Sequence, residues 1–467
     1  MRAHHITFFV VAAAAPLGYA VGSVPLALGR GGIGTAGMFL LVGLFLALFA
    51  VGYVAMSRHI ANAGALFSYV AAGLGRPLGL GTAFVAVLAY ALAATGSIGA
   101  FAVFGMQAMH SLTGVASPWY VWGLGGTAAM GCLGLLNVDL NVKLLGFVMT
   151  IEVAVLLILS AGIVAGGGAQ GLSLDALRPT AIAGGQTGVI LMLTFAAFSG
   201  FEATALFREE ARDPERTVRH AAFLSIAVIA LIQSFVTWAI VQAFGSRTAE
   251  IANAQPTELF FIAARTFVGE WLADAMIVLV VTSWFASILA FHNATARYLH
   301  VLGRDGAIPQ IFARRSAKTG APWIGSIAHT GFSLVAIVCC IAWGLEPYLD
   351  FFVVGSVPVS VSIPAMECLT AVAILAFFLR DRRGHSIWVV LAAPLLSALS
   401  LGAVLYFVLD NIPFYTAREG AVNWIMPSLN LVVLAAGVAR ALHLRRTRPA
   451  LYRRIGNWGQ DSAVTPS

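Results

Sequence analysis

The chain has 467 residues, of which 60% are hydrophobic and 10% are charged, and its formal net charge is +7. Soluble domains carry roughly 25% charged residues, so this composition excludes a soluble enzyme, and the abundance of apolar residues excludes a disordered chain. The basic excess does not indicate nucleic acid binding, because the Lys and Arg residues lie between apolar runs and not on one amphipathic, aromatic-rich surface. Four cysteines lie in apolar stretches without metal-ligand spacing: Cys132, Cys339, Cys340 and Cys368.

Apolar runs long enough to span a bilayer, about 20 residues each, recur along the whole sequence. Twelve membrane-spanning helices are predicted, at about residues 6–28, 35–57, 78–109, 118–136, 142–166, 186–207, 219–245, 271–297, 322–343, 350–379, 387–409 and 422–442. The first run does not read as a cleavable signal peptide, because Arg2 is its sole firm positive charge and no convincing cleavage site follows. The chain is therefore expected to be an all-α integral membrane protein.

The Lys and Arg residues of the connections orient the spans. With the N-terminus in the cytoplasm, 22 of the 27 basic residues fall on the cytoplasmic side, and the outside keeps Arg30, Arg178, Arg247, Arg265 and Arg418. This bias predicts an even number of spans and two cytoplasmic termini, with the plasma membrane as the default location. Residues 58–77 are expected to be a cytoplasmic connection, 251–266 one short amphipathic helix outside, and 444–467 a loose tail.

Two spans carry helix-breaking residues near their middle. The sixth has Ser199 and Gly200 directly before Glu202, and the first contains Pro16, Gly18, Gly22, Ser23 and Pro25. Irregular backbone at membrane depth is tolerated where it faces protein or a water-filled cavity. Interrupted spans in corresponding positions of two halves indicate a transporter site. The alternative interpretation is that these small residues let helices pack closely.

Short motifs in the first eight spans occur in an order typical of one transporter family. Residues 22–24 stand where Gly-Ser-Gly is common, residues 198–202 are close to Phe-x-Gly-Phe-Glu, and further matches cover residues 63–69, 209–218, 296–306 and 308–309. On these residues the chain resembles the amino acid–polyamine–organocation superfamily. The last four spans match mainly in hydropathy.

The resemblance implies a LeuT-like core of two inverted five-helix repeats, at about residues 6–166 and 186–379, with helices 1 and 6 broken. Peripheral helices at 387–442 would complete a permease domain of residues 1–443. Substrate would lie between the broken helices, its carboxylate near Gly22, Ser23 and Val24 and its ammonium near backbone carbonyls. The implied carbonyl and turn residues are Ala20, Ala196, Ala197, Phe198, Ser199 and Gly200. Tyr90 and Phe291 are expected either to wall the pocket or to be ordinary core or lipid-facing aromatics.

Three carboxylates lie inside predicted spans: Glu152, Glu202 and Glu367. A charge at the bilayer centre costs at least about 2.5–3.5 kcal/mol, so these groups should have a use, and a buried carboxylate can carry a proton near neutral pH. Glu202 is the best candidate for coupling transport to a proton gradient, the alternative being that it caps backbone N–H groups. Glu367 either recognises substrate or is hydrogen-bonded to a neighbour.

Glu152 departs from the family, whose members often carry lysine at this position. A glutamate reverses the charge, so it could carry the proton itself, pair with His292 or a substrate cation, or help to hold a metal cation. The lysine-based proton mechanism cannot be transferred to this chain. Sodium coupling therefore stays open beside proton coupling.

These observations predict a secondary active transporter of amino acids or related amines that works by alternating access, either proton-coupled or exchanging. The alternative is a transporter of another small organic cation or metabolite, with sodium as coupling ion. An enzyme is not expected, because no nucleophile–base pair or metal motif is evident, and no cofactor is expected beyond a proton or sodium ion. A major-facilitator fold would need a long loop after span six, and a sensor would need a soluble domain.

Overall fold

The described part of the chain is built from helices. The computed structural model describes residues 7, 10–11, 14–60, 65–136, 138–184, 186–202 and 214–456, and no β-strand occurs among them. Within these residues, nine helices are long and apolar enough to cross a membrane. The helical fold class is thereby confirmed, and the nine helices agree with a multi-pass membrane protein, while the prediction of twelve spans stays a prediction.

The helices follow one another with short connections. The first half contains α2 (Pro16–Gly22), α3 (Val24–Gly31), α4 (Thr35–Ser57), α5 (Ala65–Leu74), α6 (Arg76–Thr113), α7 (Trp119–Gly134), α8 (Val138–Ala165), η1 (Asp175–Leu177), α9 (Pro179–Gly184) and α10 (Thr187–Ala196). The second half contains α11 (Pro214–Phe244), η3 (Gly245–Arg247), α12 (Thr248–Ala254), α13 (Leu259–Phe267), α14 (Glu270–Arg304), η4 (Gln310–Ala313), α15 (Trp323–Ala342), η5 (Pro347–Val353), η6 (Val354–Ser356), α16 (Val357–Arg380), η7 (Trp388–Ala392), α17 (Ala393–Asp410), α18 (Ile412–Thr416), α19 (Val422–Thr447) and α20 (Pro449–Arg454).

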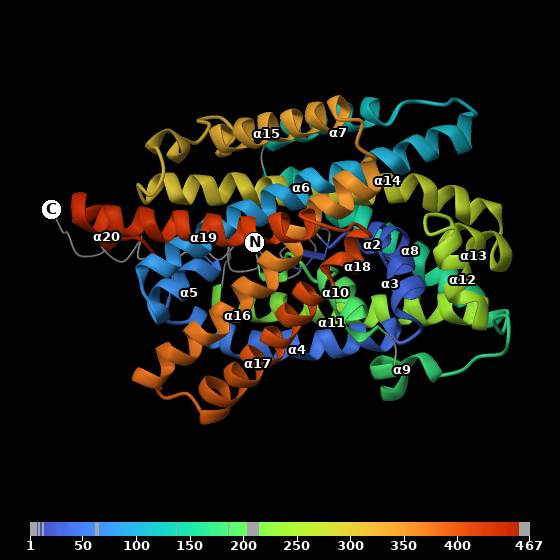
Figure 1. Ribbon diagram of the computed structural model, residues 1–467, viewed down its shortest axis with the longest axis horizontal. Coiled ribbons are helices and arrows are strands. Elements are labelled where there is room, and N and C mark those ends of the chain that lie inside the picture. Colours follow the sequence, from blue (N-terminus) through green and yellow to red (C-terminus); the bar gives the residue numbers. More distant parts are fainter. Residues whose placement is uncertain are drawn as a thin grey trace.

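Several long helices, among them α4, α6, α15 and α19, run roughly along the longest axis of the molecule, while α16 and α17 cross it obliquely (Figure 1). Helix α6 packs against α14 and α19, while α4 packs against α11, and α7 lies beside α15 at one edge. The short helices α9, α12 and α13 lie at one end of the bundle, and α5 and α20 lie at the other. The short helices α2, α3 and α10 are instead buried against longer helices, α2 against α8 and α14 and α10 against α4 and α17.

The connection expected at residues 58–77 contains a helix, α5, which packs against α16. Its apolar side chains bury against a helix that is remote in the sequence, so the local pattern alone suggested a loop. The approach is close at Gly73, where an added Cβ would lie 2.1 Å from the carbonyl oxygen of Ala373. A side chain at this position would have to push the two helices apart.

Substituting Gly73 by leucine should therefore destabilise the protein by about 1–3 kcal/mol, the usual cost of overpacking. The melting temperature of the purified protein in detergent should fall, as followed by loss of its monodisperse size-exclusion peak after heating. Gly125→Leu is a matched control, because an added Cβ at Gly125 would meet no atom within 4 Å. Equal losses in the two variants would contradict the packing role of Gly73.

Residues 251–266 form parts of two helices, α12 and α13, and not the single helix that was expected. The interruption lies at Gln255, which has φ −140° and ψ 63°. It directly precedes Pro256, and proline disfavours helical backbone in the residue before it.

The expected loose tail is wrong for residues 444–456, because α19 continues to Thr447 and α20 follows. The guanidinium of Arg440 donates to the carbonyl of Ala307 at 2.9 Å, and the Arg76 guanidinium lies 5.7 Å from the Tyr452 ring. Residues 457–467 lie outside the described part.

A buried carboxyl lies under this C-terminal segment. Burial raises the pKa of Asp305 to about 6, against the opposing effects of the Arg304 guanidinium, the Gly456 N–H and the Arg454 guanidinium. A raised carboxyl pKa means that the fold favours the neutral form. The contribution of Asp305 to this packing is therefore fully present below its ordinary pKa of 3.8 and is lost as the pH rises through about 6.

Candidate functional site

The helical path of the first span is interrupted at Ala15, which has φ 45° and directly precedes the start of α2 at Pro16. Proline lacks an N–H group and disfavours helical backbone in the residue before it. Near Ser23 the path is almost continuous, because the Ser23 N–H donates to the carbonyl of Tyr19 at 2.8 Å. The main interruption thus lies at the N-terminal end of the predicted helix-breaking stretch, and only a slight irregularity at Ser23 separates α2 from α3.

The second interruption follows α10, which ends at Ala196. Tight turns occupy residues 197–200, and Gly200 has φ 106°, a conformation that favours glycine. This is the position that the sequence predicted. The tyrosine hydroxyl of Tyr19 on α2 donates to the carbonyl of Leu193 on α10, so the two interrupted segments are joined directly.

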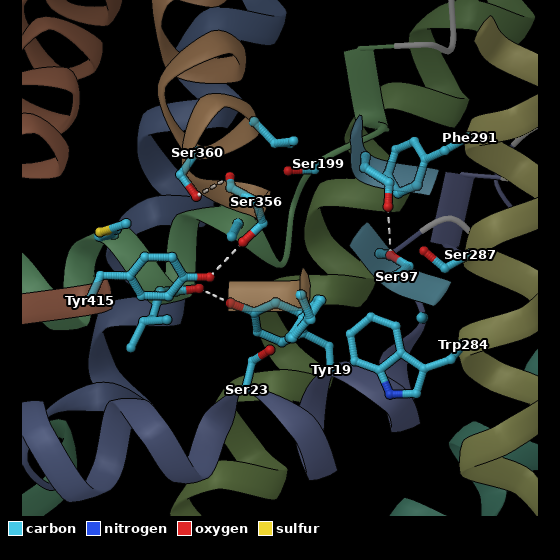
Figure 2. A pocket seen from close by; sticks show the side chains of 18 residues that line it. Tyr19, Ser23, Ser97, Ser199, Trp284, Ser287, Phe291, Ser356, Ser360 and Tyr415 are labelled. Atoms are coloured by element: carbon cyan, nitrogen blue, oxygen red, sulfur yellow. Dashed lines mark hydrogen bonds between the residues drawn. The ribbon is translucent and has the colours of Figure 1, made fainter. Parts of the chain in front are cut away.

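A small cavity of about 90 Å³ lies between these segments and the helices around them. Its lining comes from both interrupted segments, from α6 and α14, and from the start of the η5–α16 segment (Figure 2). In Figure 2, one side carries Ser356, Ser360 and Tyr415, and the opposite side carries Ser97, Trp284, Ser287 and Phe291. The remaining lining residues are Ala14, Ala15, Tyr19, Ser23, Ala93, Met192, Leu193, Ala196, Ser199, Phe352 and Val359.

Four of the predicted substrate-binding residues line this cavity: Ser23, Ala196, Ser199 and Phe291. The other predicted residues are buried but do not belong to the lining: Ala20, Gly22, Val24, Tyr90, Ala197, Phe198 and Gly200. Gly22 instead gives space to an indole, because an added Cβ would lie 2.9 Å from Cζ2 of Trp284. Its carbonyl accepts a hydrogen bond from the hydroxyl of Tyr348.

Glu152 belongs to α8, and its side chain, beside the N-terminal end of α2, is buried; the residue is 1% exposed. Its Oε2 accepts a hydrogen bond from the Ser283 hydroxyl at 2.6 Å, and Ser283 in turn accepts one from the Gly18 N–H at 3.0 Å. The Leu17 N–H also donates to Glu152. A carboxylate from α8 and a hydroxyl from α14 therefore satisfy N–H groups that the start of α2 leaves without helical partners.

Glu202 serves the second interruption in the same way and is 0% exposed. Its Oε2 accepts from the Gly200 N–H at 2.8 Å, and its Oε1 accepts from the Tyr90 hydroxyl at 2.6 Å. Its own backbone carbonyl accepts from the Tyr53 hydroxyl at 2.9 Å. The capping role considered for Glu202 is thus what the hydrogen bonds display, and it links the turn after α10 to α4 and α6.

Tyr90 connects this carboxylate to the cavity through an aromatic stack. The Tyr90 ring stacks on Phe291 with 5.9 Å between centroids, and it also contacts the Tyr298 ring at 5.4 Å. Because Phe291 lines the cavity and Tyr90 holds Glu202, a change at the carboxylate can reach the cavity wall through two side chains.

The two remaining polar candidates lie apart from the cavity lining. Glu367 on α16 is 1% exposed, and neither of its carboxylate oxygens has a hydrogen-bond partner among the described residues. It is close enough to Glu202 to interact with it electrostatically.

His292 does not pair with Glu152. Its Nδ1 lies 2.7 Å from Nδ1 of His329, and its Nε2 lies 2.8 Å from the Ser326 hydroxyl. Within the described residues, no group of three or more potential metal ligands occurs.

Comparison with known proteins decides the family. Residues 5–439 match the family model for amino acid permeases. The chain belongs to the amino acid permease family, within the amino acid–polyamine–organocation superfamily. The permease is 24% identical over 394 residues to the low-affinity putrescine importer PlaP of Escherichia coli (strain K12), an alignment that covers 80% of each chain.

Two further relatives match shorter parts of the permease. The probable threonine/serine transporter YbxG of Bacillus subtilis (strain 168) is 26% identical over 282 residues, which is 50% of the permease and 58% of the relative. The lysine-specific permease LysP of Lactococcus lactis subsp. cremoris (strain MG1363) is 30% identical over 161 residues, which is 34% of the permease and 31% of the relative. The family and these names point to permeases and not to enzymes.

Several cavity residues of the permease escaped sequence analysis, among them Trp284, Ser356 and Tyr415. The Ser356 and Tyr415 hydroxyls lie 2.8 Å apart, although Tyr415 follows α17, a helix predicted to be peripheral. Near Tyr415, the Arg418 guanidinium pairs with Asp350 at 2.5 Å. The sequence signals for these residues were weak. The signal available was that Trp and Tyr in apolar runs carry an N–H or O–H group that needs a hydrogen-bond partner when buried. The matched motifs at residues 63–64 and 209–213 lie outside the described residues.

Proposed function

We propose that the permease is a secondary active transporter that carries amino acids or related amines by alternating access. The proposed architecture has twelve spans in a LeuT-like arrangement, in which α2 and α3 belong to helix 1 and α10 begins helix 6. Contacts of α3 with α10, and of α2 with α8 and α14, support this arrangement. The names of the relatives support the substrate class, and the proposed location is the cell membrane with both termini in the cytoplasm.

The observation that carries the proposal is the linkage of Glu202 to both an interrupted helix and the cavity. When a proton binds to one Glu202 oxygen, that oxygen becomes a hydroxyl and no longer accepts as a carboxylate does. Both the Gly200 N–H and the Tyr90 hydroxyl then face a neutral carboxyl group, and the donor opposite the protonated oxygen loses its acceptor. The proposed consequence is a loosened turn after α10 and a shifted Tyr90–Phe291 stack, which couples proton binding to the cavity.

Proton coupling is favoured over sodium coupling in this proposal. The carboxylate of Glu152 faces hydrogen-bond donors, namely the Ser283 hydroxyl and the Leu17 N–H. These donors already engage the carboxylate, so a sodium ion at Glu152 would have to displace them. Glu152 is therefore proposed to hold α2 in place, and Glu202 is proposed to carry the coupling proton.

Uptake by purified protein in liposomes tests this function. We expect labelled amino acids or amines to accumulate when an inward proton gradient is imposed, and accumulation to disappear when a protonophore collapses the gradient. An inward sodium gradient at constant pH should drive little uptake. Absence of both uptake and exchange for every amino acid and amine in the panel would contradict the proposal, with protein-free liposomes as the control.

A further inference from the structure

The described residues that line the cavity between the interrupted helices combine a largely apolar wall with several hydroxyl groups. Six serines line it, together with the hydroxyl-bearing Tyr19 and Tyr415: Ser23, Ser97, Ser199, Ser287, Ser356 and Ser360. Among the described residues that line the cavity, none is Asp, Glu, Lys, Arg or His. The cavity thus offers hydroxyl groups and no side-chain charge.

The intramembrane carboxylates do not compensate for this absence of charge. Glu152 and Glu202 are 1% and 0% exposed, and both are engaged by hydrogen-bond donors. Glu367 is 1% exposed and does not belong to the lining. A second ammonium of a diamine, or the side chain of lysine or arginine, would therefore enter a desolvated site without an anionic partner, which is strongly unfavourable.

The size of the cavity sets a second limit. A volume of about 90 Å³ holds about six to nine water-sized groups, at roughly 10–15 Å³ each. Alanine, serine and threonine match a cavity of this size better than lysine or arginine, whose side chains are longer. Putrescine would fit by size but carries two positive charges.

We infer that the site selects small neutral α-amino acids, of the size of alanine, serine and threonine, over lysine, arginine and diamines. The inference rests on the proposed transport function and specifies its substrate class. A zwitterion brings no net charge into the cavity, so its two ends need only backbone groups and hydroxyls as partners.

The hydroxyls at the start of α16 suit the side chain of such a substrate. The Ser356 hydroxyl lies 2.8 Å from that of Tyr415, and the Ser360 hydroxyl donates to the Ser356 carbonyl at 3.2 Å. The Ser356 hydroxyl also donates to the Val353 carbonyl at 2.9 Å. The hydroxyl oxygens keep lone pairs that can accept a hydrogen bond, so this cluster can accept one from a substrate hydroxyl. Serine and threonine should therefore bind at least as well as alanine.

Competition in reconstituted liposomes tests the inference. Liposomes preloaded with a mixture of serine, alanine, lysine and putrescine are given external labelled serine or labelled lysine, and unlabelled competitors are titrated. We expect labelled serine to exchange, and serine, threonine and alanine to compete at concentrations about tenfold or more below those of lysine and putrescine, a difference equal to about 1.4 kcal/mol. Exchange of labelled lysine with equal or stronger competition by cations would overturn the inference and leave the transport function intact. No exchange of any compound would overturn both.

A substitution in the lining gives an independent test. Ser360→Asp adds a carboxylate to the cavity wall, so lysine and putrescine should gain on serine by about tenfold or more as competitors. Ser360→Ala is the matched control and should leave the preference for neutral amino acids in place. An Asp variant that folds, exchanges serine and shows no gain for cations would contradict the uncharged lining as the selective feature.

Discussion

Replacing Glu202 by glutamine is expected to lower proton-driven uptake by about tenfold or more, because glutamine cannot bind and release the coupling proton. The buried charge that this proton neutralises costs about 2.5–3.5 kcal/mol in a membrane, and each 1.4 kcal/mol corresponds to about tenfold. Glutamine has nearly the shape of glutamate. Its carbonyl can still accept from the Gly200 N–H, and its amide can still bond to the Tyr90 hydroxyl. The fold should therefore survive while the titrating group is lost.

The measurement compares proton-driven uptake with substrate exchange at equal pH on both sides of the liposome membrane. Glu202→Gln should retain exchange and lose the response to the gradient. Glu250→Gln is the control, since that exposed carboxylate has a side chain 68% accessible and should change neither quantity. Gradient-driven uptake at the wild-type rate in Glu202→Gln would remove Glu202 from the coupling step.

Replacing Glu152 by lysine should have the largest effect on stability. The lysine ammonium group, which is a hydrogen-bond donor, would face the Ser283 hydroxyl and the Leu17 N–H, which are donors too. These groups would then lose their acceptor. Breaking a buried charged interaction in this way costs about 3–5 kcal/mol, a large share of a total stability of about 5–15 kcal/mol. Glu152→Gln keeps an acceptor for one donor and should cost only about 1 kcal/mol.

Thermal unfolding in detergent and serine exchange in liposomes would check this order. The melting temperature should fall in the order wild type, Glu152→Gln, Glu152→Lys, and exchange should fall with it. The result also tests whether a positive charge can replace the negative charge at this position. Wild-type melting and exchange in Glu152→Lys would show that the capping contacts of Glu152 do not hold α2.

The membrane spans were the part of the fold that sequence could predict well. A spanning segment must be apolar over its whole length and must satisfy its own backbone, so α4, α6 and α14 are visible as hydropathy. Short helices outside the spans were harder to predict. The burial of α5 depends on α16, and α20 lies beside residues 305–307, so both depend on neighbours that are distant in the sequence.

The site was predicted in part. The interruption at Gly200 was placed correctly because glycine at a positive φ and the neighbouring motif agree. The first interruption was predicted only as a stretch from Pro16 to Pro25, because several helix-breaking residues compete there and the sequence does not rank them. Three-dimensional juxtapositions such as Tyr415 with Ser356, or Glu152 with the start of α2, follow from the packing of several helices. No spacing within one segment encodes them.

Both interrupted helices have backbone groups that are satisfied from within the protein, by Glu152 and Ser283 at one and by Glu202 at the other. If these groups depended on substrate for their hydrogen bonds, the substrate-free protein would have unpaired N–H groups that cost about 1–3 kcal/mol each. That cost would oppose its conformational change without substrate. In this structure these N–H groups have partners within the protein. These groups therefore need no substrate as a hydrogen-bond partner, which suits the proposed proton-driven uptake as well as exchange.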